Sequence, residues 1–208
     1  MAKNSITSDK LLVKPVSIKV AEPAALGLLG LAVAALVIGG AYAGLSHDGV
    51  SSKSLMVPWI LMFGATSQLI ACLMDFKNNN IFGATVFGTY AMTMYSIAIT
   101  IFIIAFGGEG EAVNITHYGF GLIAILFFSL IATAASLMTN KVLFSILISV
   151  DLALLVLIPH YLTGLPAEFA GYLLFITSAL SFYAAAAILL NTMAGKTVLP
   201  LGNPIWKP

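Results

Sequence analysis

Long apolar stretches separated by short polar segments dominate this chain. Six of them cover residues 23–45, 54–74, 81–108, 118–139, 142–165 and 169–195. About 20 apolar residues in a helix cross the hydrocarbon core of a bilayer. The pattern therefore predicts an all-α integral membrane protein, a bundle of six transmembrane helices over residues 21–195. An N-terminal tail, residues 1–20, and a C-terminal tail, residues 196–208, would flank it.

Composition supports the same class. Of the 208 residues, 60% are hydrophobic and only 8% are charged, whereas a soluble domain carries about 25% charged residues. Six helices of this length leave no room for a separate soluble domain. A net charge of +1 argues against nucleic acid as a partner. The single Cys72 forms no disulfide within one chain.

The lysines set the expected orientation, because basic residues concentrate in the cytoplasmic connections of membrane proteins. One side of the predicted bundle carries eight lysines and the other carries only Lys53. Both termini are therefore predicted to be cytoplasmic, in a multi-pass protein of the plasma (inner) membrane. The eight are Lys3, Lys10, Lys14, Lys19, Lys77, Lys141, Lys196 and Lys207.

Hydroxyl side chains form helical stripes in two of the stretches. One interpretation is a solute path lined by hydroxyls, and the other is helix packing, since serine and threonine are common between membrane helices. The pattern alone leaves both open. The third stretch carries Thr85, Thr89, Thr93, Ser96 and Thr100, and the fourth carries Ser129, Thr133, Ser136 and Thr139.

Four other polar residues are informative. Asp151 is the only charged residue within the six stretches, and an acid inside a membrane indicates function by default. It is expected either to carry a proton or to stay neutral and bond a neighbouring helix. Gln68 and Tyr90 are expected to contact a polar solute or to satisfy the backbone. Asn80 is predicted to cap the third helix.

No enzyme is predicted from the sequence, and no metal site or cofactor. His47, His117 and His160 are far apart and lie at or near the ends of the stretches. The chain has no zinc-protease helix motif, no serine-hydrolase elbow and no P-loop. If the protein transports a solute, the transport would be passive, driven by an ion gradient or powered by a separate subunit.

Three blocks of sequence resemble the acetate uptake transporter family, the succinate–acetate permeases. Residues 22–31 (EPAALGLLGL) are similar to the N-P-A-P-L-G-L signature of its first helix. Residues 63–95 (FGATSQLIACLMDFKNNNIFGATVFGTYAMTMY) resemble its second and third helices, and residues 195–202 (GKTVLPLG) resemble its closing G-R-T-V-L-P-x-G. The blocks occur in the family's order and spacing.

The resemblance implies a homohexamer in the lipid bilayer, with six helices and a pore in each subunit. It implies passage of acetate and related small monocarboxylates, sometimes succinate, together with protons. By position, the family's narrow ring of Phe, Leu and Tyr corresponds to Leu31, Val150 and Tyr90. The mouth motif corresponds to Glu22, Pro23, Leu26 and Gly27.

Two departures from the family bear on selectivity. The motif's asparagine is replaced by Glu22, and an ionised glutamate does not donate a hydrogen bond to a carboxylate. Glu22 is instead expected to occupy the helix N-terminus itself, a place that attracts anions. Leu31 in place of phenylalanine is expected to widen or reshape the constriction.

These features favour a solute that sheds its charge at the constriction, because desolvation of an acetate ion is costly. Its polar partners would be Gln68, Thr85, Thr89 and Tyr90, with Asn80 near the cytoplasmic mouth, and Asp151 would handle protons. Two other functions stay open. One is a passive channel for neutral solutes such as ammonia or urea, and the other is a membrane subunit that transports nothing.

Overall fold

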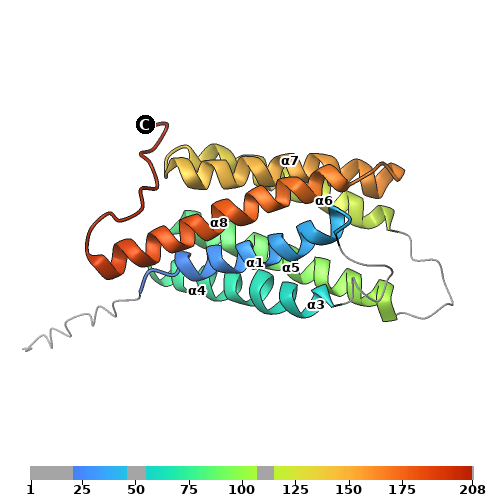
Figure 1. The fold of residues 1–208 in the computed structure, drawn as a ribbon, viewed down its shortest axis with the longest axis horizontal. Helices are drawn as coiled ribbons and strands as arrows, with labels where there is room; N and C mark the ends of the chain where they lie inside the picture. The colour runs from blue at the N-terminus through green and yellow to red at the C-terminus, as the bar shows by residue number, and fades with distance from the viewer. Residues whose placement is uncertain (1–20, 46–54, 107–114, 208) are drawn as a thin grey trace, which may run out of the picture.

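The computed structural model describes residues 21–45, 55–106 and 115–207. The predicted N-terminal tail, His47 and Lys53 lie outside these ranges. Six spans in the described part are long and apolar enough to cross a membrane, which confirms the predicted fold class (Figure 1). They are α1 (Ala24–Tyr42), the continuous helix α3–η1–α4, α5 (Ile81–Phe106), α6 (Thr116–Ser136), α7 (Lys141–Thr163) and α8 (Glu168–Ala194).

The second span changes its winding along its length. It begins as α3 (Met56–Trp59), continues as the π-helical segment η1 (Ile60–Ser67), and ends as α4 (Gln68–Lys77). Pro58 lies in the first turn of α3, where the missing backbone N–H has no helical partner to lose. The wider π-helical segment rotates the residues that follow it relative to a regular helix.

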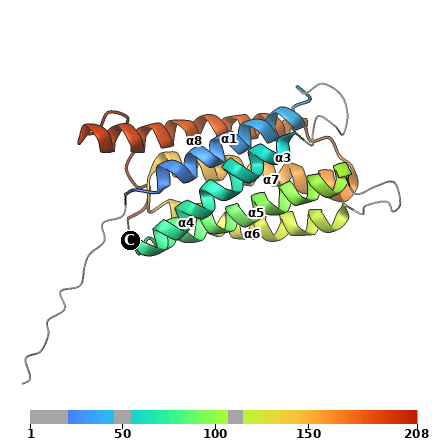
Figure 2. The same cartoon turned by 90° about the horizontal axis from the view of Figure 1, so that it is seen from below.

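The six spans run side by side along one axis (Figures 1 and 2). Helix α1 packs against α8 and against the second span, α5 packs against the second span, and α7 packs between α6 and α8. Helices α5 and α6 touch only sparsely. The helices therefore form a ring with one thin seam, and residues that face its centre come from all six spans.

Two asparagines cap the helices that start at the same end of the bundle. The side-chain oxygen of Asn80 accepts from the Gly83 amide at 3.2 Å, which confirms the predicted cap of α5. Asn140 caps α7 in the same way, from the Leu143 amide at 2.9 Å. We call this end of the bundle the lysine end, because Lys77, Lys141 and Lys196 lie there. The opposite end is called the far end.

The segment after α8 crosses the lysine end as a hydrogen-bonded strap. The Asn191 side chain on α8 makes three hydrogen bonds to this segment. It donates to the Leu199 carbonyl and accepts from the amides of Val198 and Leu199. The carbonyl of Leu201 accepts from the Val142 amide at 3.2 Å. The strap therefore joins the ends of α7 and α8.

Candidate solute pathway

Three cavities follow one another along the centre of the ring. The lysine-end cavity has a volume of about 80 Å³, the central cavity about 70 Å³ and the far-end cavity about 250 Å³. Each has room for several water molecules. The lysine-end and central cavities share two lining residues, Leu31 and Tyr90. The central and far-end cavities share Ile38, Tyr42, Ile97 and Tyr118.

The junction of the first two cavities is formed by residues that the family resemblance had selected. Leu31 on α1 and Tyr90 on α5 are 6% and 4% exposed and separate the lysine-end cavity from the central one. Val150 on α7 lines the central cavity and is also buried. The structure thus brings these three side chains from α1, α5 and α7 to the wall of the central cavity.

Tyr90 also begins a buried chain of hydrogen bonds. Its hydroxyl lies 2.7 Å from Ser129 Oγ on α6, and Ser129 donates to Asp151 Oδ1 on α7. Thr133, one turn further along α6, donates to Asp151 Oδ2 at 2.7 Å. Asp151 itself does not line any of the three cavities. It therefore reaches the pathway through Ser129 and Tyr90.

Gln68 and Asn80 line the lysine-end cavity. The Gln68 amide, 1% exposed, donates to the Gly64 carbonyl at 2.6 Å. Asn80 caps α5 with its oxygen and donates to Asp75 Oδ1 at 2.9 Å with its nitrogen. Both side chains therefore hold the fold while presenting polar atoms beside the cavity.

The stripe on α5 divides between two sides of the helix. Thr93 lines the central cavity and Thr100 lines the far-end cavity. Thr89 lies instead in a shallow groove between α5 and α6, and Thr85 is exposed on the outside of the bundle. Of the threonines selected as solute partners, neither Thr85 nor Thr89 is among the residues that line the three cavities.

The hydroxyls of the stripe on α6 bond Asp151 or the helix backbone, and none of them lines one of the three cavities. Ser129 and Thr133 bond the carboxyl group. Ser136 and Thr139 each donate to the helix backbone, to the carbonyls of Thr133 and Ser136 at 2.7 Å. For this helix the packing interpretation is the one that the contacts favour.

The mouth motif shapes the start of α1. Glu22 accepts from the Ala24 amide at 3.2 Å, and so occupies the helix N-terminus as the sequence predicts. Pro23 is the N-cap of α1, and the helix proper begins one residue later. A Cβ on Gly27 would lie 2.6 Å from the Phe87 ring, so glycine permits close contact between α1 and α5. Leu26 is 42% exposed and is not among the residues that line the three cavities.

A buried carboxyl group lies behind the lysine-end cavity. Asp75 is 1% exposed, and its Oδ1 accepts from Asn80. Within the described residues its Oδ2 has no hydrogen-bond partner. That oxygen packs against Gly83, where a Cβ would collide with it. Asp75 and Asp151 are the two buried charged side chains of the described chain.

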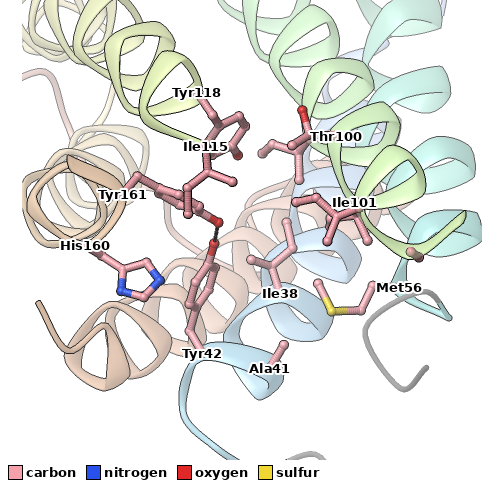
Figure 3. Close-up of a pocket in the computed structure, with 13 residues that line it drawn as sticks. Ile38, Ala41, Tyr42, Met56, Thr100, Ile101, Ile115, Tyr118, His160 and Tyr161 are labelled. Atoms are coloured by element: carbon pink, nitrogen blue, oxygen red, sulfur yellow. Dashed lines mark hydrogen bonds between the residues drawn. The ribbon is translucent and has the colours of Figure 1, made fainter. Parts of the chain in front are cut away.

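Aromatic side chains gather at the far-end cavity (Figure 3). The hydroxyls of Tyr42 and Tyr161 are hydrogen-bonded to each other. The Tyr118 ring meets the Tyr161 ring edge-on, with centroids 4.6 Å apart, and His160 lies edge-on to Tyr42 at 6.0 Å. These side chains come from α1, α6 and α7 and line the far-end cavity, and Tyr42 and Tyr118 also line the central one.

Sequence reasoning missed this tyrosine cluster and the role of Ser129. The tyrosines lie at the ends of three different helices, and nothing in their spacing indicates that they meet. Ser129 and Thr133 did carry a signal, since residues four apart share a helix face and the next helix holds Asp151. Among the described residues no group of three or more His, Cys, Asp or Glu side chains could hold a metal ion.

The fold and the three cavities define a polytopic membrane protein with a candidate solute path within a single chain. The model of the GPR1/FUN34/yaaH family matches residues 6–202, and the chain belongs to this family.

The chain is also similar to curated proteins and to a solved structure. The chain is 28% identical over 188 residues to the succinate-acetate/proton symporter SatP of Escherichia coli strain K12, covering 89% of this chain and 97% of that protein. It is 27% identical over 198 residues to an uncharacterized protein of Methanothermobacter thermautotrophicus, covering 89% and 93%. The solved structure of the bacterial acetate channel SatP superposes with a TM-score of 0.80 at 27% identity, covering 88% of this chain and all of that one.

Proposed function

We propose that this protein transports acetate and related small monocarboxylates across a membrane, with succinate as a further substrate. The observation that carries the proposal is the line of three cavities interrupted at Leu31 and Tyr90. It occurs in a chain whose fold matches an acetate channel over 88% of its own residues and over all of that channel. We therefore propose a transporter rather than an enzyme, with Leu31, Tyr90 and Val150 as its constriction.

The lining of the central cavity supports a solute that crosses in neutral form or with a proton. None of the described residues that line it is charged, and its polar members are Tyr42, Tyr90, Thr93, Tyr118 and Thr177. An acetate ion would lose its hydration there without meeting a cation, which is costly in a low-dielectric site. Hydroxyls are suitable partners for the neutral acid. We propose proton-linked passage, with Asp151 as the proton-handling group.

Orientation and assembly belong to the same proposal. The lysine end would face the cytoplasm of a cell bounded by the plasma membrane, because basic connections stay on that side. The resemblance supports a homohexamer in the lipid bilayer with one path per subunit. Native mass spectrometry of the detergent-solubilised protein tests the hexamer. Reactivity of single cysteines placed at Lys77 or Lys196 toward an impermeant reagent tests the orientation.

The first experiment is uptake of radiolabelled acetate into proteoliposomes, with and without an inward proton gradient. Stimulation by the gradient would support proton-linked transport, and equal uptake in both conditions would support an acetate channel. Val150→Trp should block uptake, because it fills the central cavity. Leu152→Trp is the matched control, since Leu152 lies on the same helix and is 45% exposed on the outside of the bundle.

Competition separates the remaining possibilities. Unlabelled acetate and succinate should reduce the labelled uptake, whereas urea and ammonia should not. Flux of urea or ammonia that Val150→Trp also blocks, without acetate uptake, would replace the proposal by a neutral-solute channel. Folded protein that passes none of these solutes would indicate a membrane subunit that transports nothing.

A further inference from the structure

The chain of hydrogen bonds from Tyr90 to Asp151 has a defined direction. All three side chains are buried, with exposed fractions of 4% for Tyr90, 0% for Ser129 and 4% for Asp151. An ionised carboxylate only accepts hydrogen bonds, so Ser129 must use its single proton on Asp151. The 2.7 Å contact between Ser129 and Tyr90 then requires Tyr90 to donate. The tyrosine oxygen is left to present an acceptor to the cavities that it lines.

Protonation of Asp151 on Oδ1 reverses this direction. The new carboxyl O–H donates to Ser129, Ser129 donates to Tyr90, and the Tyr90 proton turns toward the cavity. Thr133 donates to Oδ2 in both states, so it holds the carboxyl group in place while the chain reverses. Tyr90 thus offers an acceptor, which suits a carboxylic acid, or a donor, which suits a carboxylate.

We propose that Ser129 is a positioning residue that couples the protonation of Asp151 to the hydrogen-bonding state of Tyr90 at the constriction. This inference rests on the proposed transport function and deepens it. In the coupled step a carboxylic acid in the cavity gives its proton to the Tyr90 oxygen. The Tyr90 proton passes to Ser129 and the Ser129 proton passes to Asp151. Three O–H bonds break and three form, leaving a carboxylate that accepts from Tyr90.

Among the described residues of the helices packed around Asp151, no other charged side chain lies beside it to take over this role. From α6 it meets the hydroxyls of Ser129 and Thr133. On α8, which packs on the other side of α7, the titratable residues are Glu168, Tyr172 and Tyr183, and Glu168 is exposed in the first turn at the far end. Tyr172 is exposed and Tyr183 donates to the Pro200 carbonyl at the lysine end. Lys141, His160 and Tyr161 of α7 itself lie at its ends.

Acetate uptake measured across a pH range tests the coupling. Ser129→Ala keeps Asp151 and Tyr90 but removes their link. We expect proton-driven uptake to fall about tenfold, the scale of one hydrogen bond to a charged group, and the pH profile to flatten. Ser129→Thr restores the hydroxyl and should restore the profile. Ser178→Ala is the matched control, since Ser178 is buried and bonded to the Ala32 carbonyl, away from the chain.

A double variant and a spectroscopic signal distinguish coupling from a structural role. In an Asp151→Asn background Ser129→Ala should cause no further change in the pH profile. In the wild-type protein the infrared carbonyl band of protonated Asp151 should shift when acetate binds, and Ser129→Ala should abolish that shift.

A wild-type protein that transports acetate while Ser129→Ala keeps its pH profile would overturn this inference alone. A wild-type protein without acetate uptake would overturn the proposed function first.

Discussion

The hydroxyl of Tyr42 at the end of α1 is hydrogen-bonded to the hydroxyl of Tyr161 near the end of α7, across 119 residues of sequence. Tyr42 lines both the central and the far-end cavity, and Tyr161 lines the far-end cavity. The bond therefore joins two helices at the point where the central cavity would open toward the far end (Figure 3). We therefore expect the pair to separate when a solute passes between the two cavities.

Tyr161→Phe should make the central cavity more accessible from the far end. A neutral hydrogen bond contributes about 0.5–1.5 kcal/mol, so we expect roughly a two- to tenfold faster reaction. The measurement is labelling of Ala153→Cys, a buried position of the central cavity, by an impermeant thiol reagent in a Cys72→Ala background. Tyr183→Phe serves as control, because its hydroxyl bonds the Pro200 carbonyl at the other end. Equal rates in both variants would exclude a closing role for the tyrosine pair.

Gly30→Ala should destabilise the bundle. A Cβ at Gly30 would collide with Ser67 Oγ and the Phe63 carbonyl of η1, and backbone atoms do not move aside easily. Overpacking of this kind costs about 1–3 kcal/mol. Gly40→Ala on the same helix is the control, because among the described residues no atom beyond its own stretch of helix backbone lies within 4 Å of the added Cβ. Thermal unfolding in detergent should show a lower midpoint for Gly30→Ala only. Alanine favours a helix over glycine, so a matching loss in both variants would contradict this prediction and exclude the contact with η1 as its cause.

Asn80→Ala should lower the free energy of unfolding more than Asn140→Ala does. Both variants lose a helix cap, worth about 0.5–2 kcal/mol. Only Asn80→Ala also removes the one hydrogen bond of the buried Asp75 carboxyl group within the described residues, which adds about 1–3 kcal/mol. Adding Asp75→Asn to Asn80→Ala should recover part of the loss, because no charge is then buried. The measurement is the unfolding midpoint of the wild type, the two single variants and the double variant. Equal losses for Asn80→Ala and Asn140→Ala would show that the hydrogen bond from Asn80 to Asp75 does not stabilise the fold.

The lengths of the apolar stretches were sufficient to predict the six spans and the fold class. A helix needs about 20 apolar residues to cross the bilayer core, so each span is visible in the sequence. The cap at Asn80 and the helix-end position of Glu22 followed from local chemistry and are confirmed. Such features depend on residues within one turn. The π-helical winding of η1 had no comparable local signal.

The candidate pathway depends on which helix faces lie at the centre of the ring, and a single stripe does not reveal this. The stripe on α5 appeared continuous, yet Thr93 and Thr100 line cavities while Thr85 is exposed. Leu31, Tyr90 and Val150 were selected through the family resemblance. That they form the constriction remains a prediction. The link from Tyr90 through Ser129 to Asp151 required three helices to be packed together before it became visible.

Substitutions at the constriction should change the largest carboxylate that passes. Val150→Ala removes two methyl groups from the wall of the central cavity, and we expect butyrate uptake to rise relative to acetate. Leu31→Phe adds bulk where the lysine-end and central cavities meet and should lower that ratio. One methylene in an apolar site changes discrimination by about 1–3 kcal/mol, so each ratio should shift about tenfold or more.

The control for both is Leu29→Phe, because Leu29 also lies on α1 but is 38% exposed and lines none of the three cavities. Its butyrate-to-acetate ratio should equal that of the wild type in the same proteoliposomes. Opposite shifts for Val150→Ala and Leu31→Phe require the two side chains to bound one opening, since a general loss of packing would lower both fluxes together. A ratio that moves equally in Leu29→Phe and Leu31→Phe would place the size filter elsewhere, with the tyrosine pair at the far end as the next position to test.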